Sequence, residues 1–192
     1  MPILGYDWPR LHAALNDLPA ALLFATVLFD FGAWITKRAS LEGAAIWTLW
    51  AGVIGGWAAV LAGLQAEDAI EHGEAIHKIM EQHETSALVM MSAFTLVLAY
   101  KLFRRGNLSS VERLALRGVS LFGFIGIFFA ASLGGKLAFE HAAGVPTETL
   151  EAEIKDRAQE HHHHEGAAAD SAHHEDSAHH HDDHGHDSDH KH

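Results

Sequence analysis

Six carboxylates and three histidines fall within the twenty residues from Gln65 to Glu84. Asp68 and His72 are four residues apart, and Glu74 and His77 are three apart, so on a helix each pair shares one face. Imidazole suits Zn, Cu, Fe and Ni, and carboxylates shift the preference toward Zn, Fe or Ni. The stretch is therefore a candidate metal-binding segment, and its alternative is a solvated amphipathic surface helix.

A second concentration of ligand-type residues follows Pro146, where thirteen of the 18 histidines alternate with Asp and Glu. Thr147 can cap a short helix through about Gln159, and beyond it the composition is too polar to bury a core. Such a His-rich tract binds divalent transition metals through many weak ligands. The candidate ligands there are His161, His162, His163, His164, His179, His180, His181, His184 and His186.

The chain has no cysteine, and its net charge is −12 with neutral histidine. Disulfides, thiolate metal sites and covalent haem attachment through cysteine are therefore excluded. Any metal would need nitrogen and oxygen ligands. The sequence contains no Ser/His/Asp arrangement, phosphate-binding loop or basic nucleic-acid patch, so we expect neither an enzyme nor a nucleic-acid-binding protein.

Four apolar segments must position these residues: 18–36, 44–66, 85–103 and 118–137. A hydrocarbon layer about 30 Å thick needs roughly 20 apolar residues in a helix, and in lipid the backbone must bond within its own segment. We therefore predict an all-α integral membrane protein, an up-down-up-down four-helix bundle within residues 1–145. Residues 146–192 form the second region, a short helix followed by a disordered tail.

Basic residues predict how the bundle crosses the membrane. Seven of them flank the two short connectors: Lys37, Arg38, Lys101, Arg104, Arg105, Arg113 and Arg117. By the positive-inside rule these connectors are cytoplasmic, and both termini lie on the periplasmic or extracellular side of a bacterial inner membrane. The N-terminus has no basic region before a cleavage site, so we expect no cleaved signal peptide. All 18 histidines then lie outside the cytoplasm.

The outer ends of the four helices meet in such a bundle, which would bring separate ligand-type residues together. His12 and Asp17 begin the first span, His83 opens the third and His141 follows the fourth. We expect a metal site among them. The alternative is haem b held by two imidazoles from His12, His83 and His141, as in a membrane cytochrome.

Asp30 is an acid within the first apolar segment. An ionisable residue at such a position indicates a functional site, whether proton relay, ion ligand or partner to a polar group. The alternative is a protonated side chain bonded to Thr or Ser of a neighbouring helix.

The residues from Leu11 to Leu23, LHAALNDLPAALL, resemble the LHPxLVHFPIALL opening of the bacterial predicted-membrane-protein family of unknown function numbered 2231. GGKLAFEH at 134–141 resembles that family's GGxLVxxHG, and His83 opens the third span as the family's histidine does. The resemblance implies a four-helix membrane fold and no particular activity. Ala13 and Asp17 depart from the pattern, since they stand where the family has Pro and a second His.

These observations predict a lipid-embedded protein that handles Zn, Ni, Co or Cu on its non-cytoplasmic face. The alternatives are a b-type cytochrome for electron transfer and a non-enzymatic accessory subunit of a larger membrane complex. A transport pathway through four helices would require a homo-oligomer.

Overall fold

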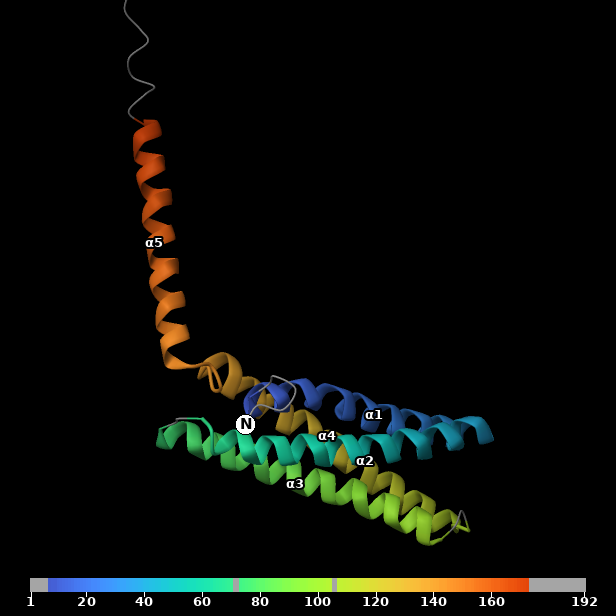
Figure 1. The fold of residues 1–192 in the computed structure, drawn as a ribbon. Coiled ribbons are helices and arrows are strands. Elements are labelled where there is room, and N and C mark those ends of the chain that lie inside the picture. Colours follow the sequence, from blue (N-terminus) through green and yellow to red (C-terminus); the bar gives the residue numbers. More distant parts are fainter. Residues whose placement is uncertain (1–6, 71–72, 105–106, 173–192) are drawn as a thin grey trace, which may run out of the picture. The chain divides into compact units, whose positions relative to one another are not determined.

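The computed structural model describes residues 7–70, 73–104 and 107–172, and they contain only helices and the turns between them. The elements are α1 (Trp8–Thr36), α2 (Ala39–Glu67), α3 (Glu74–Phe103), α4 (Ser110–Gly135), the π-helical turn η1 (Lys136–Glu140) and α5 (Thr147–Ala172) (Figure 1). Residues through Gly144 form one compact unit and those from Val145 another. The predicted all-α fold is confirmed.

Local sequence signals set the ends of the long helices. Asp7 caps α1 by accepting a hydrogen bond from the backbone N–H of Arg10. Ser109 and Glu112 form a reciprocal capping box at the start of α4, which satisfies two amide groups that the first turn leaves without partners. Lys37 ends α1 in the left-handed conformation, with φ of 59°. The first hairpin therefore turns within two residues.

All four long helices are long and apolar enough to cross a membrane. They extend beyond the apolar segments, since α1 begins at Trp8 and α3 at Glu74. The polar stretch 65–84 is thus mostly helical, and its connector is only residues 68–73. A helix of 29 residues, such as α1, measures about 43 Å, which exceeds the roughly 30 Å of hydrocarbon. The polar helix ends account for the difference.

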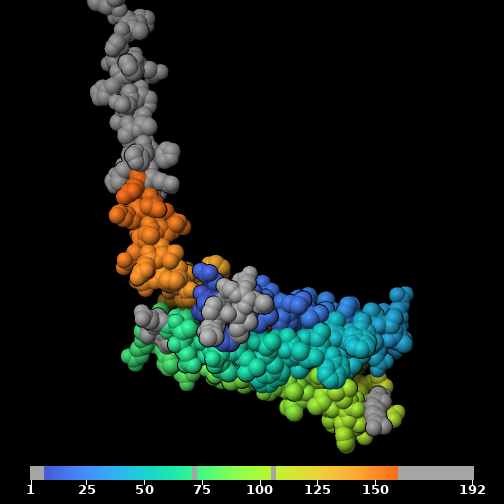
Figure 2. Space-filling view, in the orientation of Figure 1, coloured from blue at the N-terminus to red at the C-terminus, as the bar shows by residue number. Residues whose placement is uncertain are grey.

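Each long helix contacts its two neighbours in the ring order α1, α2, α3, α4, so α1 and α3 face each other across the diagonal. Figure 2 shows α2 between α1 and α3. The most deeply buried core side chains are at most 2% exposed, among them Leu23, Leu49, Phe94 and Val97. Many large apolar side chains point outward, such as Trp47 and Phe128. That outer surface suits lipid contact.

Contacts in the first hairpin recur in the second at a spacing of 71 residues. The pattern G-x-I-G-x-x-x-A-x-x-x-G occupies residues 52–63 of α2 and 123–134 of α4. A Cβ at Gly52 would lie 2.8 Å from the side chain of Leu23, and one at Gly123 would lie 2.8 Å from Phe94. These glycines allow α1 to approach α2, and α3 to approach α4, in the same way. The α1–α2 hairpin and the α3–α4 hairpin are structural repeats.

Two names describe the ends of this bundle. The hairpin end holds the α1–α2 and α3–α4 turns, at residues 37–38 and 104–109. The terminal end holds the start of α1, the end of α2, the start of α3 and the end of α4. The two ends carry different chemistry.

The second unit contains α5, which continues past the expected end near Gln159 and ends at Ala172. The helix therefore includes His161, His162, His163 and His164. Ala and Glu are strong helix formers, and they make up much of residues 165–172. The disordered tail expected after this helix stays a prediction, because residues 173–192 lie outside the described residues. His179, His180, His181, His184 and His186 lie outside the described residues.

Candidate functional site

Two histidines face each other across the diagonal of the bundle at its terminal end. His12 comes from the first turns of α1, and His83 from the first turns of α3. Their ring centroids are 6.1 Å apart, and the ring planes are nearly perpendicular, at 86°. Both residues are half-buried. The sequence placed these two residues among several that could converge, and the structure brings this pair together, whereas their ligand role stays a prediction.

The same backbone interaction orients both rings. His12 Nδ1 lies 2.8 Å from the carbonyl oxygen of Ala59 on α2, and His83 Nδ1 lies 2.8 Å from that of Ala130 on α4. A carbonyl oxygen can only accept, so in each ring Nδ1 carries the hydrogen and donates it. A neutral ring in this tautomer keeps the lone pair on Nε2. Each histidine therefore offers one nitrogen as a metal ligand or proton acceptor.

Glycine provides the space for each ring. A Cβ at Gly63 would lie 3.0 Å from ring atoms of His12, and one at Gly134 would lie 3.3 Å from His83. The partner residues again differ by the 71-residue spacing of the repeat. The pair is thus one arrangement built twice, once by each hairpin.

Other predicted ligands of the terminal end lie apart from this pair. Asp17, Asp68, His77 and His141 are all exposed. His77 Nδ1 is 3.8 Å from a carboxylate oxygen of Glu67, and His72 lies outside the described residues. Within the described ranges, no three His, Asp or Glu side chains are placed as a metal-binding group.

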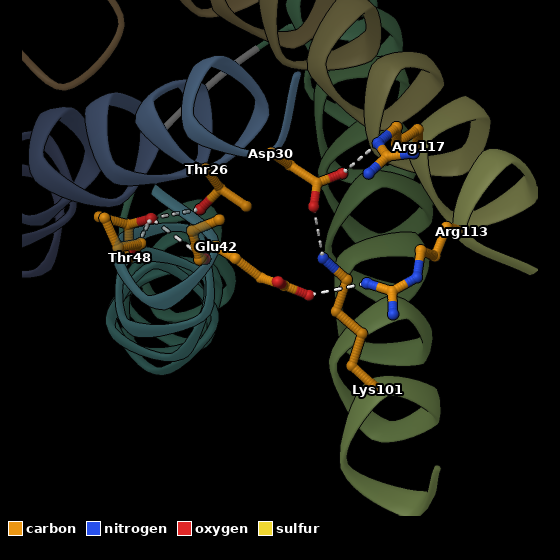
Figure 3. A network of polar contacts seen from close by, with 9 residues as sticks. Thr26, Asp30, Glu42, Thr48, Lys101, Arg113 and Arg117 are labelled. Atoms are coloured by element: carbon orange, nitrogen blue, oxygen red, sulfur yellow. Dashed lines mark hydrogen bonds and ion pairs between the residues drawn. The ribbon is translucent and has the colours of Figure 1, made fainter. Parts of the chain in front are cut away.

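Asp30 belongs to a separate network at the hairpin end (Figure 3). It lies six residues before Thr36, the last residue of α1. Its Oδ1 is 3.1 Å from Lys101 Nζ, and its Oδ2 is 3.1 Å from Arg117 Nε. The three side chains are only 13%, 15% and 11% exposed, in that order. Of the roles that the sequence left open, the structure favours a partner to charged groups.

A second ion pair lies beside the first. Glu42 Oε1 of α2 is 2.8 Å from Arg113 Nη1 of α4. Thr48, a hydroxyl on the neighbouring helix α2, accepts a hydrogen bond from Thr26 at 2.9 Å and not from Asp30. Figure 3 shows all three ion pairs spanning the space between the hairpins. At the hairpin end the two hairpins are therefore joined by ion pairs, whereas at the terminal end they meet in the edge-on contact of two imidazole rings.

Sequence reasoning missed the groups that support both sites. It assigned Lys101 and Arg117 to membrane orientation alone, and it did not identify the Ala59 and Ala130 carbonyls. The signal was present: in each half a histidine precedes the alanine of the repeated motif by 47 residues. A comparison of the two halves of the sequence would have paired His12 with His83.

Comparison with curated proteins and with solved structures found no match. A family model described as a predicted membrane protein, DUF2231, matches residues 9–147. That range contains both hairpins, both facing histidines and the charged network. It also agrees with the resemblance seen in the opening and closing motifs. The chain belongs to the DUF2231 family of predicted membrane proteins.

Proposed function

We propose that this membrane protein binds a transition-metal centre between His12 and His83, at the terminal end of the bundle. The observation that carries the proposal is the matched anchoring of the two rings, each with Nδ1 2.8 Å from a carbonyl of the neighbouring helix. Histidines that bind metals usually donate their other N–H to such a group, which fixes tautomer and orientation. The pair has this supporting interaction on both sides.

The separation of the rings suits one shared centre. With metal–nitrogen distances of about 2.1 Å, two imidazoles on one ion have centroids roughly 5 to 6.5 Å apart, depending on the angle at the metal. The centroids here are 6.1 Å apart, at the upper end of that range. A divalent ion such as Zn, Ni, Co or Cu would then be held by two imidazoles.

A metal centre with only two protein ligands suits metal handling better than a structural role. Structural zinc sites are closed by four protein ligands, whereas open positions hold water or an incoming ligand. A centre held by two imidazoles would exchange its metal readily. The His-rich region after residue 160 would gather ions for it, since many histidines raise the local concentration of bound metal.

Haem b is a second candidate, because it requires only the two protein ligands that this site has. Among the described residues the pair has no third His, Asp or Glu with which to form a metal-binding group. A porphyrin supplies four nitrogens itself and requires only two axial imidazoles. The pair lies on diagonal helices, so a group bound by both would lie in the middle of the bundle. The function would then be electron transfer.

We further propose that the terminal end faces away from the cytoplasm of a bacterial cell. The support is the basic hairpin end, which the positive-inside rule assigns to the cytoplasm. Alkaline phosphatase fused to either terminus should be active, and green fluorescent protein fused there should be dark. The reverse pattern would place the histidine pair on the cytoplasmic side.

The test of the metal site uses protein truncated after Gln159, which lacks the His-rich segment. A Soret band in its visible spectrum would assign haem, and calorimetric titration with Zn²⁺ and Ni²⁺ measures divalent binding. His12→Ala and His83→Ala should each weaken metal binding at least about tenfold, or abolish the Soret band. The matched control is His141→Ala, because His141 is exposed and follows η1. Unchanged affinity in both ligand variants would refute the proposal.

A further inference from the structure

A cavity of about 410 Å³ opens at the hairpin end. The histidine pair lies at the opposite end of the bundle. Its apolar lining includes Ile46 and Leu102. Its charged lining comes from all four long helices and comprises Asp30, Glu42, Lys101, Arg113 and Arg117. Figure 3 shows these five side chains directed toward one another across the space between the hairpins.

The charges in this cavity do not cancel. Three cations face two carboxylates, so the lining carries one positive charge. Lys101 and Arg117 share Asp30, and Arg113 pairs with Glu42. A net charge on partly buried groups is unfavourable unless a counter-ion compensates it. The cavity therefore suits an anion.

Hydrogen-bond donors remain for such an anion. Arg117 Nε is buried 3.1 Å from Asp30 Oδ2 and makes no hydrogen bond within the described residues, so this nitrogen belongs to the ion pair and is not open to an anion. Arg113 uses Nε and Nη1 for Leu108 and Glu42, which leaves Nη2. Lys101 makes one hydrogen bond through an ammonium group that has three N–H groups.

The depth of the cavity indicates the source of the anion. Because the helices exceed the hydrocarbon thickness, their last several ångströms lie at the level of lipid headgroups. Arg113 is the fourth residue of α4, and Glu42 is the fourth residue of α2. Asp30 and Arg117 lie about one turn deeper, beside the apolar lining. The charged groups thus span the level at which phospholipids carry their phosphodiesters.

We propose that this cavity binds the phosphodiester headgroup of an anionic phospholipid. One phosphodiester carries one negative charge and neutralises the lining. Arginine matches phosphate oxygens with paired N–H groups, and the apolar lining can accept the glycerol and first acyl carbons. A lipid with a single net negative charge fits better than a zwitterionic one, whose amine would meet the same cations. Free phosphate offers the same chemistry without the apolar part.

The experiment measures lipid binding to the full-length protein in detergent by native mass spectrometry and by thermal unfolding. Phosphatidylglycerol is the probe, with phosphatidylcholine and inorganic phosphate as comparisons. Arg113→Gln removes the excess charge and should weaken phosphatidylglycerol binding about tenfold or more. Arg38→Gln is the matched control, because Arg38 is an exposed cation at the same end that does not line the cavity. It should bind as the unchanged protein does.

Glu42→Gln gives a test of opposite sign, since it raises the charge of the lining and should tighten phosphatidylglycerol binding. If Arg113→Gln is unstable with phosphatidylcholine as well as with phosphatidylglycerol, its loss of binding reflects misfolding. Glu42→Gln then still tests the proposal. Equal losses in Arg113→Gln and Arg38→Gln would show general surface attraction and overturn the proposal. It would also be overturned if Glu42→Gln weakened binding, or if inorganic phosphate stabilised the protein as much as phosphatidylglycerol does.

Discussion

Replacing Asp30 by Asn should strongly destabilise the bundle. The change removes the only carboxylate within ion-pair distance of Lys101 and Arg117 among the described residues, at 3.1 Å from each. Both cations are at least 85% covered, so they would stay partly buried without a counter-charge. Removing one partner of a buried ion pair costs about 3 to 5 kcal/mol. Because the groups retain some exposure, we expect about 3 kcal/mol here.

Thermal unfolding in detergent, followed by circular dichroism, measures this effect. For a chain of 192 residues, 1 kcal/mol lowers Tm by about 2 to 4 °C, so Asp30→Asn should lower it by about 6 to 12 °C. The matched control is Glu42→Gln, whose ion pair with Arg113 is more exposed, at 60% for the carboxylate. Exposed pairs contribute at most about 1 kcal/mol. Its Tm should therefore fall by less than about 4 °C.

A combined variant separates charge from packing. Asp30→Leu with Lys101→Met and Arg117→Leu removes the whole network and leaves apolar side chains of similar size. Such replacements are often neutral or stabilising, because no buried charge is left without a partner. Most of the lost stability should return. If Asp30→Asn lowers Tm no more than Glu42→Gln does, the buried network is not what joins the hairpins.

Three further predictions concern packing, the second unit and acid. Gly123→Ala should destabilise the protein by about 1 to 3 kcal/mol, because the new Cβ would lie 2.8 Å from the buried Phe94 ring. Gly118→Ala is the control: no atom lies within 4 Å of its Cβ, so it should be neutral or slightly stabilising. Chemical denaturation measures both. Truncation after Gln159 should leave the Tm of the first unit within about 2 °C, since that unit is compact through Gly144; a larger fall would show that the tail packs against it. Divalent-metal affinity should fall as the pH drops from about 7 to about 5.5, because imidazole has an ordinary pKa of about 6.5 and must be neutral to bind a metal. Calorimetry at both pH values measures the change. An affinity that does not depend on pH would exclude histidine ligands.

The four spans could be predicted from sequence because lipid requires long apolar helices. The starts of α1 and α3 could not, since residues such as His12 and Glu74 belong to helix ends that protrude from the hydrocarbon and carry no hydropathy signal. For the same reason the stretch 65–84 was read as a connector. Hydropathy reports where lipid lies, and hydrogen bonding decides where a helix begins.

The facing histidines were predicted as one of several pairings. Choosing among them required knowing that α1 and α3 are diagonal, which depends on helix order around the bundle. The partners of Asp30 were harder still, because Lys101 is 71 residues away and its charge also fits the positive-inside rule. A lysine that fits the positive-inside rule gives no sign in the sequence that it also forms a buried ion pair.

The repeat has a consequence for how the two hairpins recognise each other. Asp30 faces Lys101, and Glu42 faces Arg113, and in both pairs the partners occupy equivalent positions 71 residues apart. Two copies of the first hairpin would oppose acid with acid, and two copies of the second would oppose base with base. Charge therefore selects one hairpin of each kind and disfavours self-association. Twofold symmetry is kept at the imidazoles, where both halves contribute the same group, and is broken at the other end, where the halves must be told apart.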